Sequence, residues 1–80
     1  MEYSEIIKDI KTIIEDIADI MQDEISDDSA MIDDLDLSSV EIMSIVADVE
    51  RHFSVKISES EMLSISTVGE LAEVVESKIQ

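Results

Sequence analysis

Cysteine is absent from this chain of 80 residues, and basic and aromatic residues are scarce. Without cysteine the chain can form no disulfide, no catalytic thiolate and no zinc–sulfur site. Only 5 Lys and Arg stand against 21 Asp and Glu, which gives a net charge of −16. Nucleic acids and anionic membrane surfaces bind through basic residues, so this balance argues against both as ligands. Basic patches on partner proteins are its natural complement.

The only rings are those of Tyr3, Phe53 and His52, so a core has to be built from Ile, Val, Leu and Met. A length of 80 residues allows one small domain spanning 1–80, and a bundle of short helices fits this supply of side chains. Strongly acidic chains are often disordered. The apolar content of 45% and the clear apolar periodicity favour a folded domain instead.

No uninterrupted apolar run approaches the roughly 18 residues of a membrane span, and the first ten residues lack the basic and then apolar layout of a signal peptide. We therefore expect a cytoplasmic monomer with no membrane span. Apolar residues recur at intervals of three and four from Glu2 to about Met21, which predicts the first helix. Its polar face is acidic on balance, so it suits a bundle better than a membrane surface.

Residues 22–37 contain seven acidic residues and no basic one, with apolar residues at irregular spacing. This predicts a long loop pinned to the core at a few points, and loops of this length are usually functional. An EF-hand that began at Asp23 would have Ile25 at its third position and Asp28 where glycine is required. We therefore predict no dedicated metal site, only weak and nonspecific binding of divalent ions. The apolar residues of the loop are Ile25, Met31, Ile32, Leu35 and Leu37.

The stretch 33–53, DDLDLSSVEIMSIVADVERHF, predicts a helix that starts at its two serines. Ser38 and Glu41 have the spacing of a capping box, with Ser38 as N-cap and Ser39 as the first helical residue. The Ser39 hydroxyl would then lie where unpaired N–H groups and the helix dipole favour a bound or covalently attached phosphate. Taken alone, the motif favours the simpler interpretation that both serines only cap the helix.

This helix has more apolar surface than one buried face requires. The core face is formed by Ile42, Ile45, Val46, Val49 and Phe53. A second stripe, Val40, Met43 and Ala47, begins beside Ser39 and is bordered by Glu50. Either the preceding loop covers this stripe or another protein docks on it.

The rest of the chain predicts an extended link at 54–57 and two further helices. Ser58 and Glu61 form a second capping-box pair before a helix of one or two turns, and Thr67 and Glu70 form a third before the last helix. The last helix has Gly69 in its first turn and an inner face of Val68, Leu71, Val74, Val75 and Ile79.

The segment D-L-D-L-S-S-V-E, from Asp34 to Glu41, resembles the signature of the acyl carrier protein family. The helix that follows ends in Phe53, fourteen positions after Ser39, and Thr67-Val68-Gly69-Glu70 is similar to the opening of the family's final helix. The family's serine carries a 4′-phosphopantetheine arm that comes from coenzyme A. Two features fix the register, Asp34-Leu35 upstream and Phe53 downstream, and both place Ser39 at the modified position. The family usually has Asp where this chain has Ser38 and Leu where it has Val40, a departure typical of a specialised carrier.

The resemblance implies an all-α, acyl-carrier-protein-like bundle of four helices, three longer and one short, with the long acidic loop between helices one and two. It implies a carrier and not an enzyme, with an acyl group held as a thioester on the arm for fatty-acid, polyketide or related enzymes. The expected partners are a phosphopantetheinyl transferase and acyl-loading and acyl-processing enzymes with basic docking patches. They would dock on the helix after Ser39, through Val40, Glu41, Met43, Ala47, Asp48 and Glu50.

Three alternatives stay open at this point: an aminoacyl or peptidyl carrier domain, an acidic helical interaction module without a cofactor, and a binder of divalent ions. His52, the only histidine, has no catalytic arrangement around it in the sequence, and we interpret it as a solvated residue near a helix end. Arg51 beside it suits the negative end of the helix dipole. We therefore predict no catalytic residue.

Overall fold

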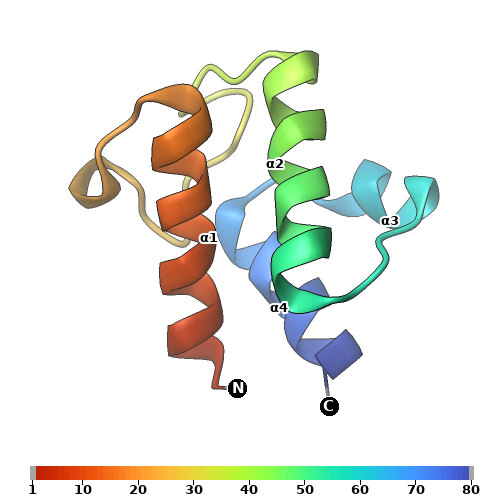
Figure 1. Cartoon of the computed structure of the whole chain (residues 1–80). Coiled ribbons are helices and arrows are strands. Elements are labelled where there is room, and N and C mark those ends of the chain that lie inside the picture. The colour runs from red at the N-terminus through yellow and green to blue at the C-terminus, as the bar shows by residue number, and fades with distance from the viewer. Residues whose placement is uncertain (1, 80) are drawn as a thin grey trace.

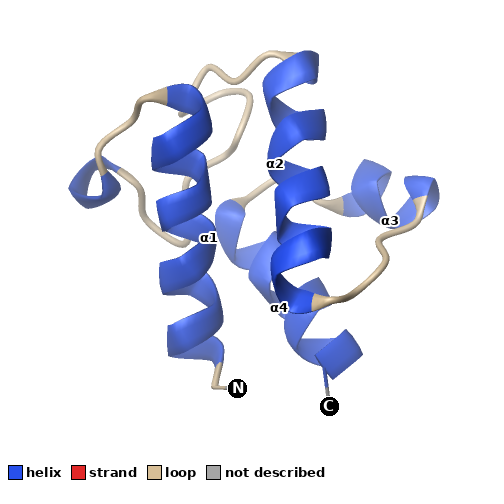
Figure 2. Cartoon of the chain, viewed as in Figure 1, coloured by secondary structure: helices blue, strands red, loops and turns tan. Residues whose placement is uncertain are grey.

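The computed structural model describes residues 2–79 as helices joined by loops (Figures 1 and 2). The elements are α1 (Tyr3–Ala18), a short 3₁₀ helix η1 (Gln22–Glu24), α2 (Ser39–Phe53), α3 (Glu59–Ser64) and α4 (Val68–Ile79). The predicted all-α bundle of three longer helices and one short helix is therefore confirmed. Residues 54–57 form the expected link, and the described residues contain no β-strand, only an isolated bridge between Ala30 and Thr67.

The helices α1 and α2 run in opposite directions side by side, and α4 packs behind them (Figure 1). Both α2 and α4 contact α1. Residues 19–38 cross from the end of α1 to the start of α2 at one end of the bundle, whereas the start of α1 and the end of α4 lie at the other end. The start of α2 is therefore far from both of these helix ends and next to the acidic loop.

Aliphatic side chains from every long helix form one core, as the scarcity of aromatic residues required. Fully buried Ile side chains of α1 and α2 meet fully buried Val and Leu side chains of α4, and loop residues close the core from above. Burial of each such side chain stabilises the fold by about 1.5–3 kcal/mol. The most deeply buried large side chains are Ile6, Ile10, Ile14, Ile45, Val49, Val68, Leu71 and Val75.

The first helix is shorter than its apolar pattern predicts. It ends at Ala18 because Asp19 adopts the left-handed conformation (φ 59°) and donates its N–H to the Glu15 carbonyl oxygen. The prediction that the helix extends to about Met21 was therefore wrong by three residues. Ile20 still packs against the core, but Met21 is exposed.

The long loop is pinned to the core at a few points, as expected. Ile25, Met31 and Leu37 are buried, whereas Ile32 is 65% exposed. Residues 22–24, expected as loop, wind into η1, which is closed when Ile25 donates its N–H to the Gln22 carbonyl oxygen. Within residues 2–79, no helix has both the length and the apolar composition needed to cross a bilayer.

Candidate functional site

The start of α2 is held by a complete capping box. The Ser38 hydroxyl accepts a hydrogen bond from the Glu41 N–H at 3.2 Å, and the Glu41 carboxylate accepts one from the Ser38 N–H at 2.9 Å. Ser38 is therefore the N-cap and Ser39 the first residue of the helix, as the sequence predicts. The Ser38 hydroxyl therefore has a structural role in the cap.

Ser39 is exposed, as Ser38 is, but within residues 2–79 the Ser39 hydroxyl makes no hydrogen bond. Among the described residues, nothing accepts a hydrogen bond from the N–H groups of Ser39 and Val40, the two donors of the first turn that the capping box leaves over. These donors and the positive end of the helix dipole suit a phosphate bonded to the Ser39 hydroxyl. The residues present therefore fit attachment of a phosphate-linked group at Ser39.

The loop fixes where this serine stands. Leu37 is buried and donates its N–H to the Met31 carbonyl oxygen at 3.0 Å, which ties the chain down immediately before the cap. The Asp34 carboxylate accepts from the Ala30 N–H at 2.7 Å and closes the preceding turn. Asp36, with φ 55°, supplies the left-handed step between turn and cap. The acidic loop therefore presents the start of α2 to solvent in a defined position.

The second apolar stripe of α2 is open. Val40 is 72% exposed and Met43 is 64% exposed, so the acidic loop does not cover them. Ala47, one turn further along, is half-buried. Of the two interpretations of this stripe, loop cover is therefore excluded, and an apolar strip remains on the surface beside Ser39.

The three acidic residues expected around the stripe each also have a structural partner. Glu41 belongs to the capping box, Asp48 pairs with Arg51 one turn later, and the Glu50 carboxylate accepts from the Ile57 N–H at 2.8 Å. Glu50 thus holds the link between α2 and α3 against the end of α2. Their charges remain on the α2 surface, but their side chains are less free than the sequence suggests.

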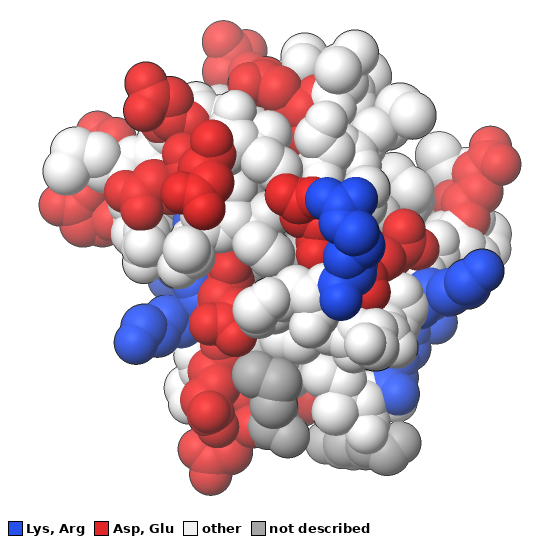
Figure 3. Space-filling model, viewed as in Figure 1, with Lys and Arg blue, Asp and Glu red and all other residues white. Residues whose placement is uncertain are grey.

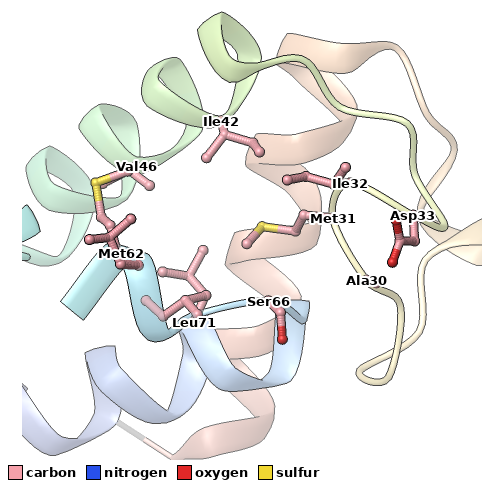
Figure 4. Close-up of a pocket in the computed structure, with 11 residues that line it drawn as sticks. Ala30, Met31, Ile32, Asp33, Ile42, Val46, Met62, Ser66 and Leu71 are labelled. Atoms are coloured by element: carbon pink, nitrogen blue, oxygen red, sulfur yellow. The ribbon is translucent and has the colours of Figure 1, made fainter. Parts of the chain in front are cut away.

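A cleft of about 380 Å³ opens on the other side of α2, between α2, α3 and the acidic loop (Figure 4). Ile42 and Val46 line it from α2, and Met31 lines it from the loop. Ser39 precedes Ile42 by three residues and Val46 by seven, so all three lie on one side of the helix. The cleft therefore begins one turn below the Ser39 hydroxyl.

The walls of the cleft are almost wholly aliphatic. Met62, Leu63 and Ile65 line it from α3 and its end, Leu71 lines it from α4, and the only charged residue is Asp33. The sequence pattern does not reveal this cleft, because its walls come from four separate segments. The available signal was the apolar run Met62-Leu63 in a helix that buries none of its residues fully.

The short helix α3, which forms one wall of the cleft, is held in place through Glu61. Ser58 and Glu61 form the predicted capping box, and Lys78 of α4 lies 3.0 Å from the Glu61 carboxylate. The Ser58 N–H and, second, Lys78 lower the pKa of Glu61 below its usual value. Opposite charges thus hold α3 against α4.

The start of α4 has the third predicted capping box. The Glu70 carboxylate accepts from the Ser66 hydroxyl at 2.7 Å, the Ser66 N–H at 2.8 Å and the Thr67 N–H at 2.9 Å. These bonds, that of the Ser66 hydroxyl first, lower the pKa of Glu70 to about 2. Glu70 thus fixes Ser66, which lines the cleft.

Acidic side chains cover much of the α1 and loop side of the face in Figure 3, whereas the few basic ones are scattered. The Nε2 atom of His52 lies 3.1 Å from the Asp9 carboxylate, and this contact joins α2 to α1. Across residues 2–79, no three His, Asp or Glu side chains are grouped so that they could hold a metal ion.

The chain matches the family model described as "Phosphopantetheine attachment site" over residues 8–75, which includes Ser39 and the cleft. The chain belongs to the acyl carrier protein family. It is 31% identical over 75 residues to the acyl carrier protein of Thermotoga maritima, a match that covers 94% of this chain and 93% of that protein. The acyl carrier protein of Coprothermobacter proteolyticus is 28% identical over 79 residues, covering 99% of this chain and 96% of the relative.

The fold comparison agrees with this membership. The solved structure of the acyl carrier protein from Enterococcus faecalis superposes with a TM-score of 0.80 at 29% identity, covering 98% of this chain and 99% of that one. The meromycolate extension acyl carrier protein of Mycobacterium tuberculosis is 34% identical over 67 residues, 84% of this chain and 58% of that protein. Members of this family are carriers that bear phosphopantetheine and work with biosynthetic enzymes, and they are not themselves catalysts.

Proposed function

We propose that residues 1–80 form a single carrier domain that holds an acyl group as a thioester on a 4′-phosphopantetheine arm attached to Ser39. The observation that carries this proposal is that the two neighbouring serines differ in their hydrogen bonding. The Ser38 hydroxyl is hydrogen-bonded in the capping box, whereas the Ser39 hydroxyl makes no hydrogen bond within residues 2–79 and lies beside two N–H groups that find no acceptor there. When bound, the arm supplies a terminal thiol on which the acyl group is carried.

Attachment consumes coenzyme A, and the serine is the only group of this chain that changes covalently. The Ser39 hydroxyl loses its proton, its oxygen forms a new bond to phosphorus, and the pyrophosphate bond of coenzyme A breaks to release adenosine 3′,5′-bisphosphate. The chain's own part is to keep the hydroxyl accessible and to offer N–H donors to the phosphate oxygens. Since the chain has 21 acidic residues and only 5 basic ones, the basic groups have to come from the transferase.

The aliphatic cleft favours an acyl group over an aminoacyl or peptidyl group as the cargo. A chain of methylene groups gains about 0.8 kcal/mol for each group buried. An amino group or a peptide would lose hydrogen bonds to water in a cleft whose polar side chains are those of Asp33 and Ser66. The cleft begins on the side of α2 below Ser39, so a tethered acyl chain can reach it.

Partner enzymes dock, in this proposal, on the exposed stripe of α2. Val40 and Met43 supply an apolar contact beside the attachment point, and Ala47 extends the strip down the helix. The carboxylates of Glu41, Asp48 and Glu50 border it and attract a basic patch on the partner. Such charge complementarity mainly raises the association rate, and the adaptable Met43 side chain gives the contact its selectivity.

The decisive experiment is a mass spectrum of the protein after incubation with coenzyme A and a phosphopantetheinyl transferase. We expect a gain of one phosphopantetheine group that maps to Ser39, no gain in Ser39→Ala, and a gain in Ser38→Ala. Modification of Ser39→Ala with none of Ser38→Ala would place the site at Ser38. If several transferases are tried and none modifies the wild type or either variant, the chain is an acidic interaction module without a cofactor.

A further inference from the structure

The cleft beside α2 has a defined far end. In Figure 4, Val46 and Met62 lie at one end, and Ile32 and Asp33 lie at the other, with Ile42 between them along α2. Helix geometry places Val46 about 6 Å further along the axis than Ile42, and further from Ser39. A chain that enters below Ser39 and follows α2 therefore meets Met62 last.

We propose that Met62 sets the length of the acyl chain that the cleft encloses. The proposal rests on the proposed function, because it assumes that the acyl group on the arm occupies this cleft. Met62 lies on α3, packs against the core and closes the space between α3 and Val46. On this side the labelled lining residues end at Val46 and Met62, so methylene groups that extend past Met62 leave the cleft and gain less burial.

The chemistry of Met62 makes this limit a soft one. A methionine side chain is unbranched and has three rotatable bonds, so it fills an irregular gap and can also move aside. The α3 helix that carries it is only six residues long, Glu59–Ser64, but it is fastened to α4 through Glu61 and Lys78. When a long acyl chain presses on the end of the cleft, we therefore expect the Met62 side chain to move before the backbone of α3 does.

The cargo class that follows is an unbranched aliphatic acyl group of medium length. A volume of about 380 Å³ lies near the lower end of the range of about 300–1,000 Å³ for small-molecule sites. It clearly exceeds the roughly 150 Å³ of an apolar cavity that binds benzene. The cleft thus has room for more than a short acyl group, while the end of a long chain would extend past Met62.

The test is a series of acylated forms of the whole protein, from butanoyl to hexadecanoyl, each loaded from the corresponding acyl-coenzyme A. The measured quantity is the melting temperature of each form, followed by circular dichroism. A tethered chain that binds only the native state raises the melting temperature. In the wild type we expect the melting temperature to rise with each added pair of methylenes and then to level off.

Substitutions at Met62 should move the point at which the rise stops. Met62→Ala removes three heavy atoms, so the plateau should shift by about three methylene groups to longer chains. Met62→Phe adds bulk at the end of the cleft and should shift it to shorter ones. Met21→Ala is the matched control, because Met21 is 62% exposed and does not line the cleft. Its plateau should coincide with that of the wild type.

An unchanged plateau in both Met62 variants would overturn the proposal, as would an equal shift in Met21→Ala. The melting temperatures of the unacylated variants show whether each one folds, so a variant that does not fold leaves the other to decide. A wild type whose melting temperature does not depend on chain length would show that the cleft is not the acyl site. That result would leave attachment at Ser39 intact, since the mass spectrum tests it separately.

Discussion

The Gly69 N–H donates to the carbonyl oxygen of Asp27 across 2.8 Å, and this bond fastens the acidic loop to the first turn of α4. The two backbones can approach so closely because residue 69 has no side chain. The Tyr3 hydroxyl reaches the Asp27 carboxylate at 3.4 Å, and Lys11 lies 3.3 Å from it. Asp27 therefore joins α1, the loop and α4.

The only glycine of the chain should not tolerate a methyl group. In Gly69→Ala the new Cβ would lie 2.9 Å from the Asp27 carbonyl oxygen and 3.2 Å from the Tyr3 hydroxyl. Alanine gains about 1 kcal/mol in helix propensity, but overpacking against backbone costs about 1–3 kcal/mol. We expect a lower free energy of unfolding in urea. If Tyr3→Phe restores the full stability of Gly69→Ala, the obstacle is the hydroxyl and not the loop backbone.

Ser38 should matter for stability and not for attachment. Ser38→Ala removes the acceptor of the Glu41 N–H, and loss of an N-cap costs about 0.5–2 kcal/mol. Urea unfolding should detect this loss in Ser38→Ala. Ser39→Ala should change stability little, because alanine suits the first turn. A Ser39→Ala variant that loses as much stability as Ser38→Ala would show that Ser39 is also part of the cap.

Met43→Lys tests the proposed docking face. Met43 is 64% exposed, so a charged side chain there can stay in water and the melting temperature should change little. The rate of phosphopantetheine attachment or of acyl loading should fall severalfold, because the basic side chain removes the apolar contact and repels basic patches. Met21→Lys is the control, because Met21 is 62% exposed and lies outside α2. Equal rates for Met43→Lys and the wild type would place the docking face elsewhere.

Glu70 should give the stability of the fold a distinct pH dependence. Its pKa falls from 4.5 to about 2 on folding, so the carboxylate stabilises the native state fully above pH 4.5. That stabilisation is lost as the pH falls from about 4.5 towards 2. Glu70→Gln should therefore be less stable than the wild type at pH 7, and the two should converge in acid. Urea titrations at intervals of pH measure this difference, and a constant difference would contradict the assignment.

Salt should stabilise this protein in a graded way. The chain has a net charge of −16, so its acidic side chains repel one another. Salt screens that repulsion over a Debye length of about 8 Å at physiological ionic strength. We expect the melting temperature to rise with sodium chloride and, at lower concentrations, with either magnesium or calcium. A sharp and saturable response to calcium alone would instead indicate a dedicated ion site.

The helix starts could be predicted because the signals that set them are local. At Ser38, Ser58 and Thr67 the serine or threonine and the glutamate three positions later bond to each other as their spacing indicates. The end of α1 could not be predicted in this way. The left-handed residues that end α1 and α2 are Asp19 and Ser54, where glycine would be the usual choice.

The parts of the site that depend on contacts between distant segments could not be predicted from the sequence. The apolar stripe at Val40 and Met43 was visible in the helical period, but whether the loop covers it depends on how residues 22–37 fold back. The cleft was not visible, because Met62 meets Val46 only after α3 has been pinned to α4. Glu50 looked like a free surface charge, yet its carboxylate holds the Ile57 N–H.

In each of the four helices the third residue is a glutamate whose carboxylate accepts from the backbone N–H of the residue before the helix. This divides the acidic residues into two classes with different freedom to change. Exposed carboxylates that make no such contact can be replaced by neutral or basic residues at small cost, unlike Asp27 and Asp34, and the protein could in that way come to suit differently charged enzymes. Glu5, Glu41, Glu61 and Glu70 cannot change so freely, because each closes the helix that it begins. Relatives that evolve towards a neutral surface should therefore lose their acidic residues last at these four positions.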